Sequence, residues 1–496
     1  MDAHQAPLHI AVFPWLAFGH MIPYLELSKS LAKRGHQISF LSTPRNISRL
    51  PKLPPNLSSL ILFIPLPLPK VHGLPENAES TSDVPPEKVK FLKIALDGLQ
   101  QPFAKFLSES SKKPDWIILD FATHWAPSLA SKFSIPCIFF QVFSSSSMAF
   151  LGPPHELSQS GSSRKKPEDL TVLPDWIPFP SNLAYSLHGA RLFFQGLFDT
   201  SSGVSDISRF GSTLHACKVI APRTCMELEP QYLPLLQDLY NKPVIPVGLL
   251  PPSTNTKTSI HTSATDNAIL NWLDKQRPRS VVYIAFGSEA TLSIELLHEL
   301  AFGLEMSELH FLWALRKPVG FVGEVLPEGF EERTRERGVV TMGWVPQLDV
   351  LGHLAVGGFL THSGWSSVIE ALHFGHPLVM LPLFVDQDII TRVVEGRGFG
   401  VEVKRKEDGS FDGEAVASAL RLVMVEDEGK ELRLKAKELS EDFGGKERQE
   451  HAKAMPLRAT ISGLPFLPLK ARWPSQLLGP LLHTSIVCIP LLEVSS

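Results

Sequence analysis

Short apolar runs alternate with helical patterns along the first 140 residues. Apolar positions from Ile22 to Lys33 recur at helical spacing, with Pro23 in the expected first turn and Gly35 as a stop signal. Strands that alternate with helices predict an α/β fold with a parallel, doubly wound sheet. The predicted strands are LHIAVFP (8–14), QISFLST (37–43), WIILDF (116–121) and IPCIFF (135–140).

A second series of the same kind begins near residue 280. The stretch between the two series mixes Pro with Ser and Thr and has no apolar period, which is typical of a linker. We therefore predict domains over residues 1–245 and 267–451, joined by a linker over 246–266. The second series contains strands SVVYIAF (280–286), HFLWALR (310–316), GGFLT (357–361) and PLVMLPL (377–383), with helices at 294–306 and between 413 and 442.

The composition is that of an ordinary globular protein, because 44% of the 496 residues are hydrophobic and 20% are charged. A chain of this length can bury more than one core. The formal net charge of −4 is small and no basic tract is interleaved with aromatic residues, so we expect no nucleic acid partner. The four cysteines are too sparse for a disulfide framework, lack metal-type spacing and fit a reducing compartment.

Neither end of the chain predicts a targeting or membrane segment. The N-terminal residues MDAHQAPLHIAVFPWLAFGH lack the basic region of a signal peptide. The most lipid-like run, LLGPLLHTSIVCIPLL, is shorter than the ~20 residues needed to span a bilayer and contains two prolines. We expect a soluble, cytoplasmic protein without a membrane span.

The stretch THSGWSSVIEALHFGHP, Thr361–Pro377, places small hydroxyl residues and glycine before an apolar run of helical period. Gly375 followed by His376 and Pro377 is a stop signal, and predicted strands lie on both sides. A helix start that faces such a turn is a ready site for an anion, most often a phosphate. An ordinary capped helix of an α/β domain is the alternative at this point.

The 44 residues from Trp344 to Gln387 resemble the signature box of plant UDP-glycosyltransferases in length, order and nearly every polar position. The resemblance extends over roughly residues 8–450. It implies the GT-B arrangement, two facing doubly wound domains with a cleft between them. The acceptor is then expected mainly in the N-terminal domain and the UDP-sugar mainly in the C-terminal one. No cofactor is implied, since the UDP-sugar is a co-substrate.

The box implies a role for each of its polar positions. Trp344 offers a flat face for the uracil ring, whose edge the backbone of Val345 and the side chain of Gln347 can bind. Glu370 can accept from both ribose hydroxyls. The expected diphosphate contacts are His362, Gly364, Trp365, Ser366 and Ser367 at the helix start, with Ser288 of the AFGSE loop as a further candidate.

The segment VDQD, residues 385–388, contains both the expected sugar contacts and a possible metal-binding motif. Asp386 and Gln387 follow a predicted strand, where open α/β sheets bind ligands, and we expect them to bind sugar hydroxyls. In this resemblance a Gln at 387 is more typical of glucose donors than of galactose donors. Asp386-x-Asp388 also spells a motif that holds a metal in other glycosyltransferases. We expect no metal, because Asp386 already binds sugar and the helix start supplies positive potential.

Two positions depart from the family's pattern. Its turn usually reads His-Cys-Gly-Trp-Asn-Ser, whereas this chain has Ser363 in place of the Cys and Ser366 in place of the Asn. A hydroxyl has one donor and a shorter reach than an amide. We therefore expect the strength or choice of donor binding to change while the site is retained.

A transferase also needs a base for the acceptor hydroxyl. FGHMIP places His20 just after the first strand, and Asp120 follows the WIIL strand. Because the carboxyl ends of parallel strands lie along one edge of a sheet, we expect the two side chains to meet. A lone His at such a place is more often structural. The resemblance, however, implies that His20 is the base and that Asp120 fixes its tautomer and stabilises the imidazolium.

The resemblance and these residues together imply an inverting glycosyltransferase that moves a sugar, in the first place glucose, from a UDP-sugar to a hydroxyl of a small-molecule acceptor. Flavonoids, terpenoids and their glycosides are the expected acceptors. The opening FPWLAFGHMIPYLELSK is similar to a branch that extends existing glycosides, so UDP-rhamnose is an alternative donor. A catalytically weak UDP-sugar-binding protein is a second alternative. A nucleotide-dependent oxidoreductase would need a Gly-x-Gly-x-x-Gly turn, which FPWLAFGH does not offer.

Two regions carry less information. The acceptor pocket is expected from variable loops at 143–150 and 183–197, which identify neither the acceptor nor the oligomeric state. The tail, residues 452–496, is apolar but contains prolines at 456, 465, 468, 474, 480 and 490. Proline inside a helix costs ~3 kcal/mol or more, so we expect a poorly ordered tail instead of the family's C-terminal helix.

Overall fold

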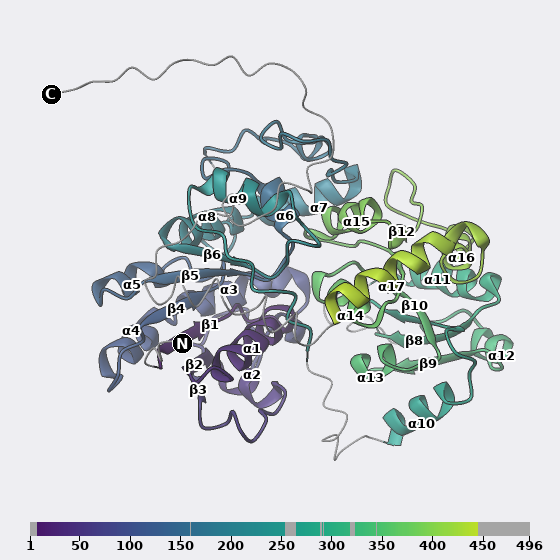
Figure 1. The fold of residues 1–496 in the computed structure, drawn as a ribbon, viewed down its shortest axis with the longest axis horizontal. Helices are drawn as coiled ribbons and strands as arrows, with labels where there is room; N and C mark the ends of the chain where they lie inside the picture. Colours follow the sequence, from purple (N-terminus) through teal and green to yellow (C-terminus); the bar gives the residue numbers. More distant parts are fainter. Residues whose placement is uncertain are drawn as a thin grey trace, which may run out of the picture.

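The computed structural model describes residues 7–158, 160–252, 264–287, 290, 292–317, 323–343 and 345–444. Figure 1 shows two lobes, each built on one six-stranded parallel sheet. The first sheet has the order β3-β2-β1-β4-β5-β6. Its strands are β1 His9–Phe13, β2 Gln37–Ser42, β3 Ile61–Pro65, β4 Trp116–Leu119, β5 Cys137–Gln141 and β6 Val219–Pro222.

The second sheet repeats this doubly wound plan with the order β12-β11-β10-β7-β8-β9. In each sheet the order reverses next to the first strand of the lobe, and ligands bind beyond the carboxyl ends of strands at such a switch point. The strands of the second sheet are β7 Val281–Ala285, β8 His310–Leu315, β9 Gly338–Met342, β10 Val356–Thr361, β11 Leu378–Met380 and β12 Gly400–Glu402.

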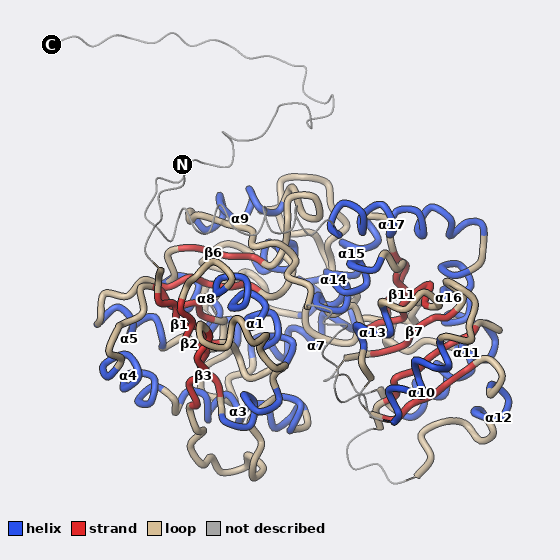
Figure 2. Tube along the Cα trace, turned by 60° about the horizontal axis from the view of Figure 1, so that its bottom comes forward, coloured by secondary structure: helices blue, strands red, loops and turns tan. Residues whose placement is uncertain are grey.

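Helices cover both faces of each sheet (Figure 2). In the described part of the chain, no helix is long and apolar enough to cross a membrane. The helices of the first lobe are α1 Phe18–Ala32, α2 Pro44–Arg49, α3 Val89–Asp97, α4 Gln100–Glu109, α5 Ala126–Lys132, α6 Ser145–Leu151, α7 Leu187–Phe198, α8 Asp206–Ala216 and α9 Tyr232–Tyr240. Those of the second are α10 Ala264–Leu273, α11 Ile294–Ser307, α12 Phe330–Thr334, α13 Gln347–Leu351, α14 Trp365–Phe374, α15 Gln387–Gly396, α16 Gly413–Met424 and α17 Lys430–Gly444.

Alternate residues of each central strand enter different cores. In β1, Ala11 and Phe13 pack toward α3 and α4, whereas Ile10 and Val12 pack toward α1. Both faces are therefore buried, which explains why these strands read as continuous apolar runs. The two parallel sheets confirm the α/β class and the doubly wound architecture predicted from the sequence.

The start of α1 corrects one prediction. The helix begins at Phe18 instead of Ile22, so His20 lies in its first turn and Pro23 in its second. Proline there removes one backbone hydrogen bond. The buried side chains of Met21 and Tyr24 pack into the core on either side of this point and hold the turn in place.

Three further expectations change in detail. The expected acceptor loops at 143–150 and 183–197 are largely helical, as α6 and α7. The strand expected at 377–383 shortens to β11, because Pro377 and Pro382 cannot donate to a sheet. The first part of the expected linker runs beside β6, where the Val247 N–H donates to the Pro222 carbonyl at 3.0 Å. The predicted tail, 452–496, lies outside the described residues.

Candidate active site

His20 and Asp120 lie together at the carboxyl edge of the first sheet. His20 Nδ1 is 2.8 Å from Asp120 Oδ2, and the imidazole is 22% exposed while the carboxylate is 2% exposed. Asp120 also accepts the backbone N–H groups of Trp15 at 3.0 Å and Phe121 at 2.7 Å, which fixes the carboxylate. With Nδ1 held by the carboxylate, Nε2 is the nitrogen that can take a proton from a substrate.

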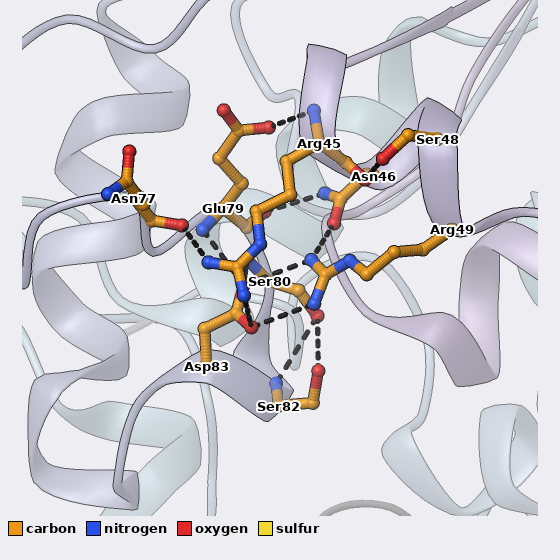
Figure 3. Close-up of polar contacts among 9 residues, drawn as sticks. All are labelled: Arg45, Asn46, Ser48, Arg49, Asn77, Glu79, Ser80, Ser82 and Asp83. Atoms are coloured by element: carbon orange, nitrogen blue, oxygen red, sulfur yellow. Dashed lines mark hydrogen bonds and ion pairs between the residues drawn. The ribbon is translucent and has the colours of Figure 1, made fainter.

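An ion pair at the end of α2 supports the turn that carries His20. The Arg49 guanidinium lies 4.9 Å from the centroid of the Phe18 ring, at the start of α1. Figure 3 shows this guanidinium directed at Asp83, to which it donates hydrogen bonds of 2.7 and 3.0 Å. Burial of the Asp83 carboxyl raises its pKa, but the hydrogen bonds and charges around it outweigh burial and hold the pKa below its usual value.

The loop that carries Asp83 is anchored in turn. Asp83 Oδ2 accepts the N–H groups of Glu79 and Ser80, each at 3.0 Å (Figure 3). The Thr81 N–H donates to the carbonyl of Leu16 at 3.0 Å, within the segment between β1 and α1. The residues just before His20 are therefore held in place by two contacts, that of Arg49 with Phe18 and that of Thr81 with Leu16.

In the second lobe, the segment from β10 to α14 forms a tight turn. Ser363 has a φ of 66°, Gly364 is the N-cap, and α14 begins at Trp365. No side chain caps this helix start. The N–H groups of the first turn have no intrahelical acceptor, so they present a partial positive charge suited to a phosphate.

His362 fits at this turn only because two neighbours are glycines. A Cβ on Gly287 would lie 2.8 Å from His362 Cε1, and a Cβ on Gly364 would lie 2.6 Å from His362 Nε2. Gly287 also has a φ of 75°, which disfavours other residues. Burial lowers the pKa of His362 to about 4, so at neutral pH the ring is an uncharged hydrogen-bonding group.

Gln347 and Glu370 lie against each other beside this helix start. Gln347 Nε2 donates to Glu370 Oε2 at 2.6 Å, and the Tyr283 hydroxyl donates to Gln347 Oε1 at 3.3 Å. Burial raises the pKa of Glu370, and the hydrogen bond from Gln347 and the charge of Arg223 offset part of that rise. The chain of contacts fixes a carboxylate that can accept from ligand hydroxyls.

Asp386 faces the first lobe from the start of α15. Burial raises the pKa of its carboxyl to about 6, while a hydrogen bond with Ser147 of α6 and the charge of His20 pull it down. Helices α6 and α15 are in contact, and the charge of His20 acts on the Asp386 carboxyl, so both groups belong to one site where the lobes meet.

The two residues after Asp386 have different partners. Gln387 Oε1 accepts the backbone N–H groups of Leu383 at 2.8 Å and Phe384 at 3.1 Å, which orients the amide. Asp388 Oδ2 accepts both the backbone N–H and the hydroxyl of Ser186, at 2.8 and 2.7 Å. Among the described residues, no group of three or more His, Cys, Asp or Glu side chains could hold a metal ion.

Trp365 and Ser366 contact the first lobe through Arg223, which follows β6. The Trp365 indole is 4% exposed and donates to the Arg223 carbonyl at 2.8 Å. Arg223 Nη1 donates to Ser366 Oγ at 2.7 Å. The Trp365 indole therefore forms a hydrogen bond between the lobes. Because the indole N–H is already used, the backbone N–H of Trp365 is the group that can bind a ligand.

The remaining predicted positions complete the picture. Val345, just before the N-cap of α13, is 6% exposed, and Ser367, in the first turn of α14, is 7% exposed. Ser288 and Trp344 lie outside the described residues. Arg223 and Ser186 were not predicted, and Arg223 directly follows β6, a strand that was not predicted from the sequence.

Comparison with known proteins places this geometry in context. Residues 104–443 match the profile of the family described as UDP-glucoronosyl and UDP-glucosyl transferase. UDP-glycosyltransferase 91C1 of Arabidopsis thaliana is 47% identical over 445 residues, 90% of this chain and 94% of that protein. Soyasaponin III rhamnosyltransferase of Glycine max is 42% identical, over 90% and 93%. The crystal structure of Arabidopsis thaliana UGT89C1 with UDP-L-rhamnose has a TM-score of 0.70 at 26% identity, over 92% and 99%.

Proposed function

The chain belongs to the UDP-glucoronosyl and UDP-glucosyl transferase family and is a UDP-glycosyltransferase with the GT-B arrangement, and we propose that it transfers glucose with inversion. The proposed acceptor is a hydroxyl of a flavonoid, a terpenoid or a glycoside of either. The observation that carries the proposal is the 2.8 Å contact of His20 with Asp120, in a site that also contains Asp386 of the other lobe.

The chemistry follows from this contact. His20 Nε2 takes the proton of the acceptor hydroxyl, and the oxygen attacks the anomeric carbon. The bond from that carbon to the diphosphate oxygen breaks with its electron pair, and UDP leaves from the opposite face. Asp120 stabilises the imidazolium that forms, because its carboxylate is held by two backbone N–H groups and excluded from water.

The donor is proposed to bind along the second lobe. The start of α14 holds the diphosphate, Glu370 accepts from the ribose hydroxyls, and Asp386 and Gln387 bind the sugar. Because Gln347 already bonds to Glu370 and Tyr283, we place its amide beside the ribose instead of the uracil edge. No metal enters this scheme, since Asp388 bonds to Ser186 and the positive potential comes from the helix start.

A donor–acceptor matrix tests the proposal. Purified protein is incubated with UDP-glucose, UDP-galactose or UDP-rhamnose and with flavonoids, triterpenoids and their monoglycosides. We expect UDP release that requires an acceptor, a hexose-sized gain in product mass, and a β-linkage by NMR from the α-linked UDP-glucose. Binding of the UDP-sugar without UDP release, whichever acceptor is added, would leave only the alternative of a weak UDP-sugar-binding protein.

UDP-rhamnose is the second candidate donor. It is supported by the 42% identity to a soyasaponin rhamnosyltransferase and by a structural neighbour solved with UDP-L-rhamnose. UDP-rhamnose would be the preferred donor if the product gains the mass of a deoxyhexose and UDP-glucose competes poorly with UDP-rhamnose. A cytoplasmic location stays a prediction, which fractionation of the native tissue would test.

A further inference from the structure

Arg223 is a buried arginine that links three parts of the protein. It directly follows β6 and is 1% exposed. Its Nε donates to the carbonyl of Leu249 at 2.8 Å, and its Nη2 donates to that of Leu250 at 3.2 Å. Its Nη1 reaches across to Ser366 Oγ at 2.7 Å. The guanidinium therefore ends at the first turn of α14, the helix start that faces the donor.

All three hydrogen-bond acceptors of this guanidinium are neutral. Among the described residues no ion pair joins Arg223 to an acidic side chain, although the charges of Glu370 and Glu26 act on it from further away. Arg209 shows the contrast, because it is equally buried but its fork closes on Asp97 at 2.7 and 2.6 Å. A buried charge without a contacting counter-ion is costly, so we expect such a charge to have a functional role.

Arg223 stays charged at neutral pH, whereas His362 does not. Burial lowers the pKa of the Arg223 guanidinium to about 10 and that of the His362 imidazole to about 4. At this turn the helix start contributes only partial charge. A full positive charge is therefore supplied to the start of α14 by the other lobe.

We propose that Arg223 is a positioning residue of the donor site and that its charge, relayed through the Ser366 hydroxyl, helps to hold the diphosphate of the UDP-sugar. Ser366 Oγ accepts from the guanidinium, so its own proton is directed to another acceptor, and a charged donor strengthens that second bond. The charge on the diphosphate grows as UDP leaves, so the effect extends to turnover. This inference rests on the proposed function.

The relay also couples donor binding to the arrangement of the lobes. Arg223 belongs to the first lobe and holds the Leu249 and Leu250 carbonyls, where the chain leaves that lobe. Ser366 belongs to the second lobe. An anion at the start of α14 therefore stabilises the contact between them, and separation of the lobes would weaken the diphosphate site.

Two substitutions separate charge from structure. Arg223→Gln keeps donors that can reach the linker carbonyls but removes the charge, whereas Arg223→Lys keeps the charge but loses the fork. Calorimetry measures binding of UDP and of uridine to each variant. Hydrogen bonds to charged groups contribute about 1.5–3 kcal/mol, so we expect Arg223→Gln to weaken UDP about 10–150-fold. Uridine should change by less than about 3-fold, and Arg223→Lys should retain most UDP affinity.

Two more variants test whether the charge of Arg223 acts on UDP binding through Ser366. In a double-mutant cycle, Ser366→Ala combined with Arg223→Gln should weaken UDP little more than the larger single change. Trp365→Phe removes another contact between the lobes but leaves the guanidinium and the Ser366 hydroxyl in place, so it should weaken UDP much less than Arg223→Gln does. Circular dichroism and thermal unfolding establish the folded fraction of each variant before binding is measured.

Several results would overturn the inference. Equal losses of UDP and uridine in Arg223→Gln, equal UDP losses in the Gln and Lys variants, or fully additive changes with Ser366→Ala would each assign Arg223 a purely structural duty. Failure of both Arg223 variants to fold would do the same. If the wild-type protein itself binds no UDP, the proposed function fails, which is a different outcome from failure of the relay.

Discussion

Replacement of Asp120 by asparagine tests the catalytic proposal most directly. The carboxylate accepts three N–H groups, those of His20 Nδ1 and Trp15 at Oδ2 and that of Phe121 at Oδ1. An amide has one oxygen and one NH2 group in the same shape. Either its NH2 faces the Phe121 N–H, or it faces both His20 and Trp15. The first orientation loses one acceptor and the second loses two, so the first should prevail.

The magnitude follows from that orientation. The imidazolium of the reaction then faces a neutral oxygen in a place where the carboxylate was 2% exposed, so water cannot substitute for it. A hydrogen bond to a charged group contributes about 1.5–3 kcal/mol, which corresponds to a fall in kcat of about 10–150-fold. Any population of the second orientation holds His20 in the wrong tautomer and lowers turnover further. The unpaired N–H should also lower the free energy of unfolding by about 1–3 kcal/mol.

The assay compares kcat for UDP release in the presence of an alcohol acceptor with the Kd for UDP. For Asp120→Asn we expect the fall in kcat with a Kd unchanged within about 2-fold, because the donor is proposed to bind along the other lobe. His20→Ala should fall at least as far, since general bases contribute about 10²–10⁴-fold. Asp115→Asn is the matched control, because Asp115 accepts the His9 N–H at 2.7 Å at the opposite end of β1 and β4.

Two results would refute this reasoning. If folded Asp120→Asn turns over within about 3-fold of wild type, the carboxylate does not assist the base. If Asp120→Asn and Asp115→Asn lose turnover equally, the loss reports general destabilisation of the sheet and not proton transfer.

The remaining predictions concern donor binding, metal and pH. Glu370→Ala should weaken UDP and UDP-glucose alike, whereas Gln387→Ala should weaken UDP-glucose far more than UDP; calorimetry with both ligands would contradict this division if the effects are equal. Turnover should survive excess chelator, and a complete loss restored by added metal would revive a metal site. The folded pKa of Asp83 is lowered, so its contribution to stability is present above the unfolded pKa and is lost as pH falls through the folded pKa. Arg49→Met should therefore reduce stability at neutral pH by about 1–3 kcal/mol and flatten the acid side of a pH–stability curve, and an unchanged acid side would contradict the assignment.

The strands that the sequence predicted and those that it missed differ in position within the sheets. The eight predicted strands are the four central ones of each sheet. Most of their residues are buried, on both faces, and give continuous apolar runs. The unpredicted strands β3, β6, β9 and β12 are the sheet edges. Three of these edge strands contain half-buried or exposed positions, so their apolar signal is weaker.

Whether a residue follows a predicted strand also decided which site residues could be predicted. The predicted donor residues other than Ser288 lie within one continuous segment, and His20 and Asp120 were paired because each follows a predicted strand. Arg223 also follows a strand at the carboxyl edge of the first sheet, but that strand is β6, which was not predicted. Its partner Ser366 was predicted as a diphosphate contact and as a departure from the family's pattern, but not as a partner of Arg223. The geometry joins the two observations, because the short hydroxyl at 366 accepts from the guanidinium at 2.7 Å and leaves its proton for the donor. Therefore a Ser366→Asn variant should gain direct reach and lose the relay, and its UDP affinity should depend less on Arg223 than that of the wild type.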